Sequence, residues 1–156
     1  MLEIFSPLAR RFRRELRRGR FEVRLGAPET TIRQFESTYG VIVPYDMRRF
    51  YRSIDGMAPS EWAFDSDMRV LPIGEVKPVH EEFADADDPS SSQPAEAFVI
   101  ADNSISAYFF AIDLRASDQP VYLVHSEPIR VATGFSDFVR KVLSDSRKLF
   151  HGEHAA

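Results

Sequence analysis

Histidine and cysteine, which often do acid–base, nucleophilic or metal chemistry, are scarce in this chain: it has four histidines and no cysteine. His125 follows an apolar run and has Asp113 and Glu127 nearby in the sequence, and a histidine beside a carboxylate is half of an acid–base pair. His151 and His154 are spaced to share one metal ion, but no third firm ligand accompanies them. Because hydrogen-bonded or solvated histidines explain these residues more simply, we predict neither a catalytic residue nor a metal site.

The motifs that usually mark catalytic or nucleotide-binding sites are missing. The seven glycines are not clustered, so the chain has no glycine-rich loop to hold a phosphate group. Ser136 follows Gly134 at the spacing of a nucleophile elbow, but the glycine needed at position 138 is a phenylalanine. The absence of cysteine excludes disulfides, thiolate metal sites and a cysteine nucleophile. We therefore predict a protein that is not an enzyme and uses no cofactor.

Charge is concentrated in two segments of opposite sign, although the whole chain has a net charge of only −4. Residues 1–24 contain eight arginines and three glutamates, a net charge of +5. Residues 65–102 contain ten acidic residues against Arg69 and Lys77, a net charge of −8. The sequence therefore has an electrostatic dipole, and the fold decides whether the molecule has one too.

The basic segment has the pattern of an amphipathic helix. Ser6 followed by Pro7 predicts the helix start, and Gly19 predicts its end. At about 100° per residue, Phe12 and Leu16 fall on one side of this helix and most of the arginines on the other. Two interpretations stay open: the helix packs on the core by its apolar side, or residues 10–24 bind nucleic acid or an anionic membrane.

The rest of the pattern predicts further helices and short strands in one domain, as a length of 156 residues suggests. Apolar spacing and turn residues predict helices over residues 28–40, 44–55 and 135–148. Short runs between turn signals predict strands, and their close spacing favours antiparallel hairpins. These runs cover residues 21–25, 62–64, 68–73, 97–101, 107–113, 121–124 and 129–131. Residues 85–94 have no apolar side chain larger than alanine, which predicts an exposed acidic loop.

A series of short motifs follows the basic segment in a characteristic order. They are Gly26-Ala27-Pro28, Phe35-Glu36, Tyr39-Gly40, Val43-Pro44, Asp55-Gly56 and, near the end, Gly134-Phe135 with Phe138-Val139. With these motifs the chain resembles the Smi/Knr-like branch of the SUKH superfamily, named after fungal regulators of cell-wall synthesis. The resemblance covers residues 25–145. The Arg-rich start lies outside the family pattern, and residues 84–95 resemble an insertion into it.

The resemblance implies an α+β fold in a single domain, mainly an antiparallel sheet packed by helices at both chain ends. Residues 1–24 would be an Arg-rich helix, residues 25–148 the SUKH-like domain, and residues 149–156 a flexible tail. The resemblance also implies protein binding without catalysis. Bacterial proteins of this kind are mostly immunity proteins that neutralise toxin domains, many of them nucleases or deaminases. A regulatory or scaffolding protein in signalling or cell-wall regulation is the alternative.

An immunity protein needs a surface that fits its toxin domain. Nuclease clefts are commonly basic, and an acidic surface with an aromatic anchor suits such a cleft. We predict that the residues that bind the partner are Trp62, Asp65, Asp67, Glu81, Glu82, Asp85, Asp87 and Asp88. Burial on one face of a strand is the alternative for Trp62, and solvation is the alternative for the paired acids. Without cysteine or a run of about 18 apolar residues, the chain is expected in the cytoplasm.

Overall fold

The structure is a computed structural model that describes residues 6–59, 61–64, 67–82, 96–103, 108–124 and 128–150, except the side chains of residues 147 and 148. Five α-helices and two 3-10 helices lie in these residues: α1 (Pro7–Arg18), α2 (Glu29–Tyr39), α3 (Tyr45–Ser53), η1 (Ile73–Glu75), α4 (Val79–Glu82), α5 (Phe135–Asp145) and η2 (Ser146–Phe150). Six strands accompany them: β1 (Met68–Val70), β2 (Lys77–Pro78), β3 (Phe98–Asn103), β4 (Phe109–Ile112), β5 (Val121–Val124) and β6 (Ile129–Ala132).

The six strands form one antiparallel sheet in the order β1-β3-β4-β5-β6, with β2 also paired to β3. From β3 to β6, neighbouring strands in the sheet are also neighbours in sequence, as in a series of hairpins. The two short strands β1 and β2 share β3: β1 pairs with its end at Asn103 and β2 with its start at Phe98. The predicted single α+β domain with an antiparallel sheet and helices at both ends is confirmed.

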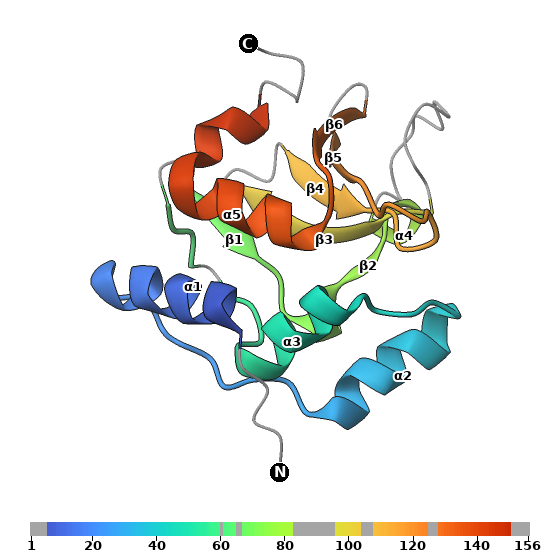
Figure 1. Cartoon of the computed structure of the whole chain (residues 1–156), viewed down its shortest axis with the longest axis horizontal. Helices are drawn as coiled ribbons and strands as arrows, with labels where there is room; N and C mark the ends of the chain where they lie inside the picture. Colours follow the sequence, from blue (N-terminus) through green and yellow to red (C-terminus); the bar gives the residue numbers. More distant parts are fainter. Residues whose placement is uncertain are drawn as a thin grey trace.

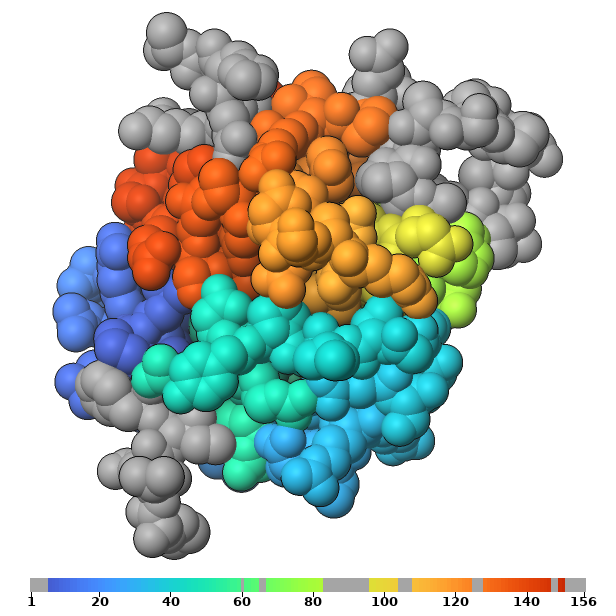
Figure 2. All heavy atoms as spheres, turned by 45° about the vertical axis from the view of Figure 1, so that its right-hand side comes forward, coloured from blue at the N-terminus to red at the C-terminus, as the bar shows by residue number. Residues whose placement is uncertain are grey.

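Aromatic side chains join the helices to one another and to the sheet. Helix α5 lies across one face of the sheet (Figure 1), where Phe138 packs on Phe110 of β4 with 5.3 Å between ring centroids. Phe50 of α3 contacts Phe12 of α1 and Phe135 of α5, each at 5.2 Å between ring centroids. Figure 2 shows α1, α3 and α5 meeting on one side of the molecule. These three helices therefore share one core.

Helix α1 forms as its local sequence predicts. The Ser6 hydroxyl accepts a hydrogen bond from the Ala9 amide at 3.1 Å, and Pro7 occupies the first helical position, where its missing N–H costs nothing. Ala9, Phe12 and Leu16 are fully buried. The interpretation that this helix packs on the core by its apolar side is therefore confirmed, and most of its arginines point away from the core.

An ion-pair network joins α2 to α3. The Arg48 guanidinium in α3 contacts Glu29 at the start of α2 and, at 2.6 Å, Glu36 further along that helix. The Val43 amide donates a second hydrogen bond to the Glu36 carboxylate at 2.7 Å. Burial alone would raise the pKa of Glu36, but the hydrogen bonds from Arg48 and Val43 hold it below its ordinary value. The carboxylate is therefore ionised where it links the two helices.

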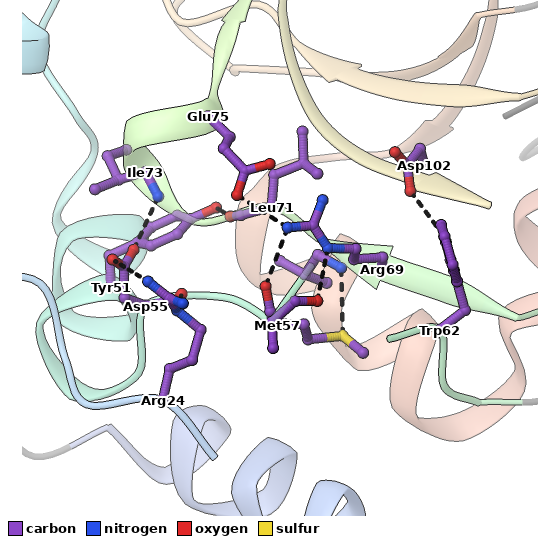
Figure 3. Close-up of polar contacts among 12 residues, drawn as sticks. Arg24, Tyr51, Asp55, Met57, Trp62, Arg69, Leu71, Ile73, Glu75 and Asp102 are labelled. Atoms are coloured by element: carbon purple, nitrogen blue, oxygen red, sulfur yellow. Dashed lines mark hydrogen bonds and ion pairs between the residues drawn. The ribbon is translucent and has the colours of Figure 1, made fainter. Parts of the chain in front are cut away.

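Two glycines of the motif series allow backbone segments to approach each other. A Cβ at Gly26 would lie 1.8 Å from the Arg52 carbonyl oxygen at the end of α3. Gly56 has a left-handed φ of +64°, and a Cβ there would lie 2.6 Å from the Leu71 and Pro72 backbone. The motif residue before it, Asp55, accepts a hydrogen bond from the Ile73 amide at 2.8 Å (Figure 3). The Gly26 motif therefore packs the segment before α2 on the end of α3, and the Asp55-Gly56 motif packs the residues after α3 on residues 71–73.

Two predicted strands are wrong because their local alternation finds no partner strand. Residues 21–25 form no strand; the Arg24 side chain donates to the Asp55 carbonyl oxygen at 2.9 Å, and Leu25 is 90% exposed. Residues 62–64 contribute a single β-bridge, Ala63 with Met68. Phe64 has a left-handed φ of +69°, and its carbonyl oxygen accepts a hydrogen bond from the Asp67 amide at 3.2 Å.

The remaining predictions differ from the structure mainly in element length. The strand predicted over residues 68–73 ends at Val70, and the chain turns into η1 after Pro72, which has no N–H for a sheet hydrogen bond. The last predicted helix ends at Asp145 and continues as η2. The short elements β2 and α4 lie in a segment where no element was predicted. Residues 85–94, the predicted acidic loop, lie outside the described residues.

Candidate protein-binding site

Four of the eight predicted binding residues lie in the described structure, all near the end of the sheet formed by β1 and β2. Trp62 and Asp67 precede β1, and Glu81 and Glu82 lie in α4, which follows β2. The other four, Asp65, Asp85, Asp87 and Asp88, lie outside the described residues.

The described acids are spread along strand β3 instead of forming one cluster. Asp67 lies beside the Asn103 end of β3, whereas α4 follows β2 at its Phe98 end. A strand of this length spans about 17 Å, so the predicted acids stand at opposite ends of a narrow surface. Two more acids belong to this surface, Asp102 and Glu75, because the charges of Glu82 and Glu75 both act on the Asp102 carboxylate. We call the whole set the acidic edge: Asp67, Glu75, Glu81, Glu82 and Asp102.

Trp62 is fixed to the acidic edge by its indole N–H. This group donates a hydrogen bond of 3.1 Å to the Asp102 carboxylate of β3 (Figure 3). Both side chains are half-buried. Burial raises the pKa of Asp102 above its ordinary value, while the bond from Trp62 and the positive charge of Arg69 act in the opposite direction. The indole ring is therefore held in one orientation, which suits an anchor residue.

Arg69 of β1 is committed to the fold. Its side chain is only 7% exposed and donates hydrogen bonds to the carbonyl oxygens of Met57 and Ala58, at 3.3 and 2.9 Å. It also binds the Glu75 carboxylate at 2.9 Å. These contacts tie the segment after α3 to the outer side of β1 (Figure 3). The edge strand is thereby covered and does not offer a free strand for pairing.

The two acids of α4 differ in their surroundings. The Glu82 carboxylate forms an ion pair with Lys77 of β2 at 3.1 Å. Glu81 is exposed and accepts a hydrogen bond from the Tyr39 hydroxyl of α2 at 3.3 Å. Burial, followed by the nearby Glu81 charge, raises the pKa of the Tyr39 hydroxyl, so the tyrosine stays neutral. The Glu81 carboxylate therefore lies at the surface without an ion-pair partner among the described residues, whereas Glu82 is paired.

The basic segment packs on the fold through α1, where the Phe12 ring lies 5.4 Å from the Phe64 ring between centroids. Arg13 and Arg24 serve the fold: Arg13 donates to the Ser53 carbonyl oxygen at 2.8 Å, and Arg24 forms an ion pair with Asp55 at 3.7 Å. Arg11, Arg14 and Arg17 are exposed. The alternative of a nucleic-acid or membrane surface on residues 10–24 stays a prediction.

No metal site is present in the part of the chain that the structure describes, where no three histidine or acidic residues come together. His80 is exposed on α4, while His125, His151 and His154 lie outside the described residues. In the same part of the chain no helix is long and apolar enough to span a membrane.

Glu75 and Asp102 are the residues of this surface that sequence reasoning counted in the acidic segment but did not select. Arg69 brings the two acids together, because it binds Glu75 and is the register partner of Asp102 in the neighbouring strand. Arg69 and Asp102 are 33 residues apart in the sequence. One signal for Asp102 was present in the sequence: it directly follows the apolar run of residues 97–101. Because side chains alternate between the two faces of a strand, a polar residue there can lie at the surface. Its partner strand was not deducible from local pattern.

The comparison with known proteins covers most of the chain. Residues 26–141 match the sequence pattern of the SMI1 / KNR4 family (SUKH-1). The match begins at Gly26 and includes α2, α3, the whole sheet and the first half of α5. Helix α1 lies outside it. No curated protein matches the chain.

Proposed function

We propose that this chain, which belongs to the SMI1 / KNR4 family (SUKH-1), binds a partner protein through its acidic edge and converts no substrate. The observation that carries the proposal is the unbalanced charge of this surface. The nearby cations Arg69 and Lys77 are already paired with Glu75 and Glu82. The charges of Asp67 and Glu81 are left to act on a partner.

The partner that fits best is a protein with a basic cleft. Complementary charge accelerates association and selects the partner, while a fixed aromatic side chain supplies buried contact area. Trp62 has the orientation for that contact, Asp67 directly precedes β1, and Glu81 lies in α4. A toxin domain that acts on nucleic acid has such a cleft, because its substrate is a polyanion. We therefore propose an immunity protein that neutralises a cognate nuclease or deaminase domain in the cytoplasm.

A regulatory or scaffolding protein is the second candidate. The observation in its favour is that exposed arginines of α1 and the acidic edge belong to different elements of one fold. Two surfaces of opposite charge suit a protein that brings two partners together. In that case the chain would bind two macromolecules at once, whereas an immunity protein needs one.

The test is co-purification with, and protection against, a toxin domain encoded beside the gene. The informative variant combines Asp67→Asn with Glu81→Gln, which removes two exposed charges. Asn tolerates the left-handed backbone at position 67, where φ is +49°. The control combines Glu15→Gln with Asp145→Asn, which removes the same charge from α1 and α5.

The expected result is weaker toxin binding and lost protection for the acidic-edge variant only. Equal binding by both double variants would overturn the acidic edge as the binding surface. No binding by the unaltered chain to the neighbouring toxin domain, together with capture of two other partners, would favour the scaffolding candidate.

A further inference from the structure

A pocket of about 400 Å³ lies where α1, α3 and α5 begin, away from the acidic edge. Figure 2 shows these three helices adjoining on one face. The polar side chains that line the pocket come from all three helices and from the cap of α1: Ser6, Arg11, Asp46, Arg49, Ser136 and Arg140. Ligand pockets in proteins commonly have volumes of about 300–1,000 Å³, so the space suits a small molecule.

The pocket has an excess of positive charge. In the described part of the chain, none of the three arginines forms an ion pair. The Arg49 guanidinium lies 5.3 Å from the Tyr45 ring centroid, and Arg11 and Arg140 are exposed. Three guanidinium groups thus face one space that holds a single carboxylate.

That carboxylate, Asp46, is already used by the fold. One of its oxygens accepts a hydrogen bond from the Met47 amide at 2.9 Å. The other accepts hydrogen bonds from the amide and the hydroxyl of Ser136 at 3.1 and 2.6 Å, which fixes α5 to α3. Asp46 therefore fixes the starts of α3 and α5 relative to each other. It accepts its hydrogen bonds from Met47 and Ser136, and the three arginines can bind a ligand.

We propose that this pocket binds a small phosphate-bearing anion. A guanidinium matches a phosphoryl group with two parallel hydrogen bonds, and the excess of charge calls for an anion with two or more negative charges. The helix starts add to this, since each carries partial positive charge. Tyr45, 75% exposed beside Arg49, offers a ring on which a nucleobase can stack.

The experiment is calorimetric titration of the full chain at low salt with pyrophosphate, ADP and adenosine. Saturable binding of pyrophosphate and ADP, but not adenosine, is expected. Similar affinity for both anions identifies a site for the phosphoryl groups alone. Tighter ADP binding that Tyr45→Ala abolishes identifies a nucleotide site. No saturable binding of either anion at millimolar concentration overturns the proposal.

Single substitutions distinguish a built pocket from general attraction. Arg49→Gln and Arg140→Gln should each weaken pyrophosphate binding about tenfold or more, since each removes a charged hydrogen-bond donor. The matched control is Arg17→Gln, which removes the same charge from the exposed end of α1. Equal weakening by all three would overturn the pocket and leave only diffuse attraction.

The pocket and the acidic edge are tested separately. The Asp67→Asn and Glu81→Gln double variant should bind pyrophosphate as the unaltered chain does. Thermal unfolding confirms that each arginine variant is folded before its affinity is compared. If the arginine substitutions weaken toxin-domain binding but leave pyrophosphate affinity unchanged, the pocket is a protein contact and the small-anion proposal is overturned.

Discussion

At the scale of single residues, function and fold depend on side chains whose neighbours are distant in sequence. Gly26 and Asp102 are examples: the first meets the end of α3, and the second meets Trp62. Neither residue is unusual as a type, and both acquire their role from the backbone that approaches them. Three predictions belong to this scale.

Gly26→Ala should destabilise the fold by about 2–3 kcal/mol, because the new methyl group would overlap the Arg52 carbonyl oxygen and force the backbone apart. Urea unfolding measures the effect. Gly74→Ala is the control, since a Cβ at Gly74 meets no atom within 4 Å, and its change should stay within about 0.5 kcal/mol. Equal stability of the two variants would contradict the close approach at Gly26.

Glu36→Gln should lower stability at pH 7 by about 1–3 kcal/mol, because Arg48 and Val43 lose a charged acceptor. The pKa of Glu36 is lower in the fold than its ordinary value of 4.5. Its contribution is therefore fully present above pH 4.5 and is lost as the pH falls through the lower, folded pKa.

The difference in unfolding free energy between the unaltered chain and Glu36→Gln, measured at pH 7 and pH 3, should accordingly shrink at acid pH. Glu96→Gln is the control, because its ion pair with Arg115 is exposed and weak. A difference for Glu36→Gln that is the same at both pH values would contradict the role of its charge.

Trp62 should report the protonation of Asp102 by fluorescence. The chain contains one tryptophan, and its N–H donates to this carboxylate. Because burial raises the pKa of Asp102, the emission should change at a pH above 3.8, the ordinary value, while the protein is still folded. Asp102→Asn should abolish this change. A titration curve identical in the variant would show that another group causes it.

At the scale of elements, α1 is the part whose importance the family match does not show. It lies before residue 26, where the match starts, yet it contributes fully buried side chains to the core that α3 and α5 share. The helix forms from local signals, its serine cap and first-turn proline, and is stabilised by packing of its apolar side. The division of the chain into residues 1–24 and 25–148 stays a prediction, and the packing of α1 leads to the fourth prediction.

Phe12→Ala should cost about 3–5 kcal/mol, because it leaves a cavity between the rings of Phe50 and Phe64. Chemical unfolding measures it. Arg14→Gln is the matched control on the exposed side of the same helix, and its effect should be within about 0.5 kcal/mol. A small effect of Phe12→Ala would mean that α1 is dispensable and that residues 25–148 fold without it.

At the scale of the whole molecule, charge is distributed over two surfaces with different tasks. The acidic edge follows β1, β2 and α4, whereas the arginine-lined pocket lies at the starts of α1, α3 and α5. The charged side chains of the two segments thus fall into two groups. Some form ion pairs within the fold, such as Arg24 with Asp55, and the others can interact with partners. Only the second group is expected to act at long range.

Association with a basic partner should therefore slow as salt is added, because screening weakens long-range attraction between exposed charges. For the proposed toxin domain, the Asp67→Asn and Glu81→Gln double variant should associate more slowly and lose most of this salt dependence. Its dissociation rate should change little. Stopped-flow binding at several salt concentrations measures both rates. An unchanged association rate would show that the partner docks elsewhere.

Local signals were sufficient for much of the fold. Helix starts at Pro7 and Tyr45 and the end of α2 at Gly40 follow from caps, prolines and a glycine within a few residues. By the same reasoning, local alternation wrongly predicted strands at residues 21–25 and 62–64. A strand is stable only when it pairs with another strand, and pairing is not encoded within a few residues.

The sequence by itself determined the α+β class, most helices, the lack of common catalytic motifs and the two charged segments. The tertiary structure alone decided which charges are free: it placed Arg69 against the backbone after α3, joined Trp62 to Asp102, and gathered Arg11, Arg49 and Arg140 around one pocket. The physical reason is that burial and pairing decide whether a charge serves the fold or a partner, and both depend on contacts between residues far apart in the chain.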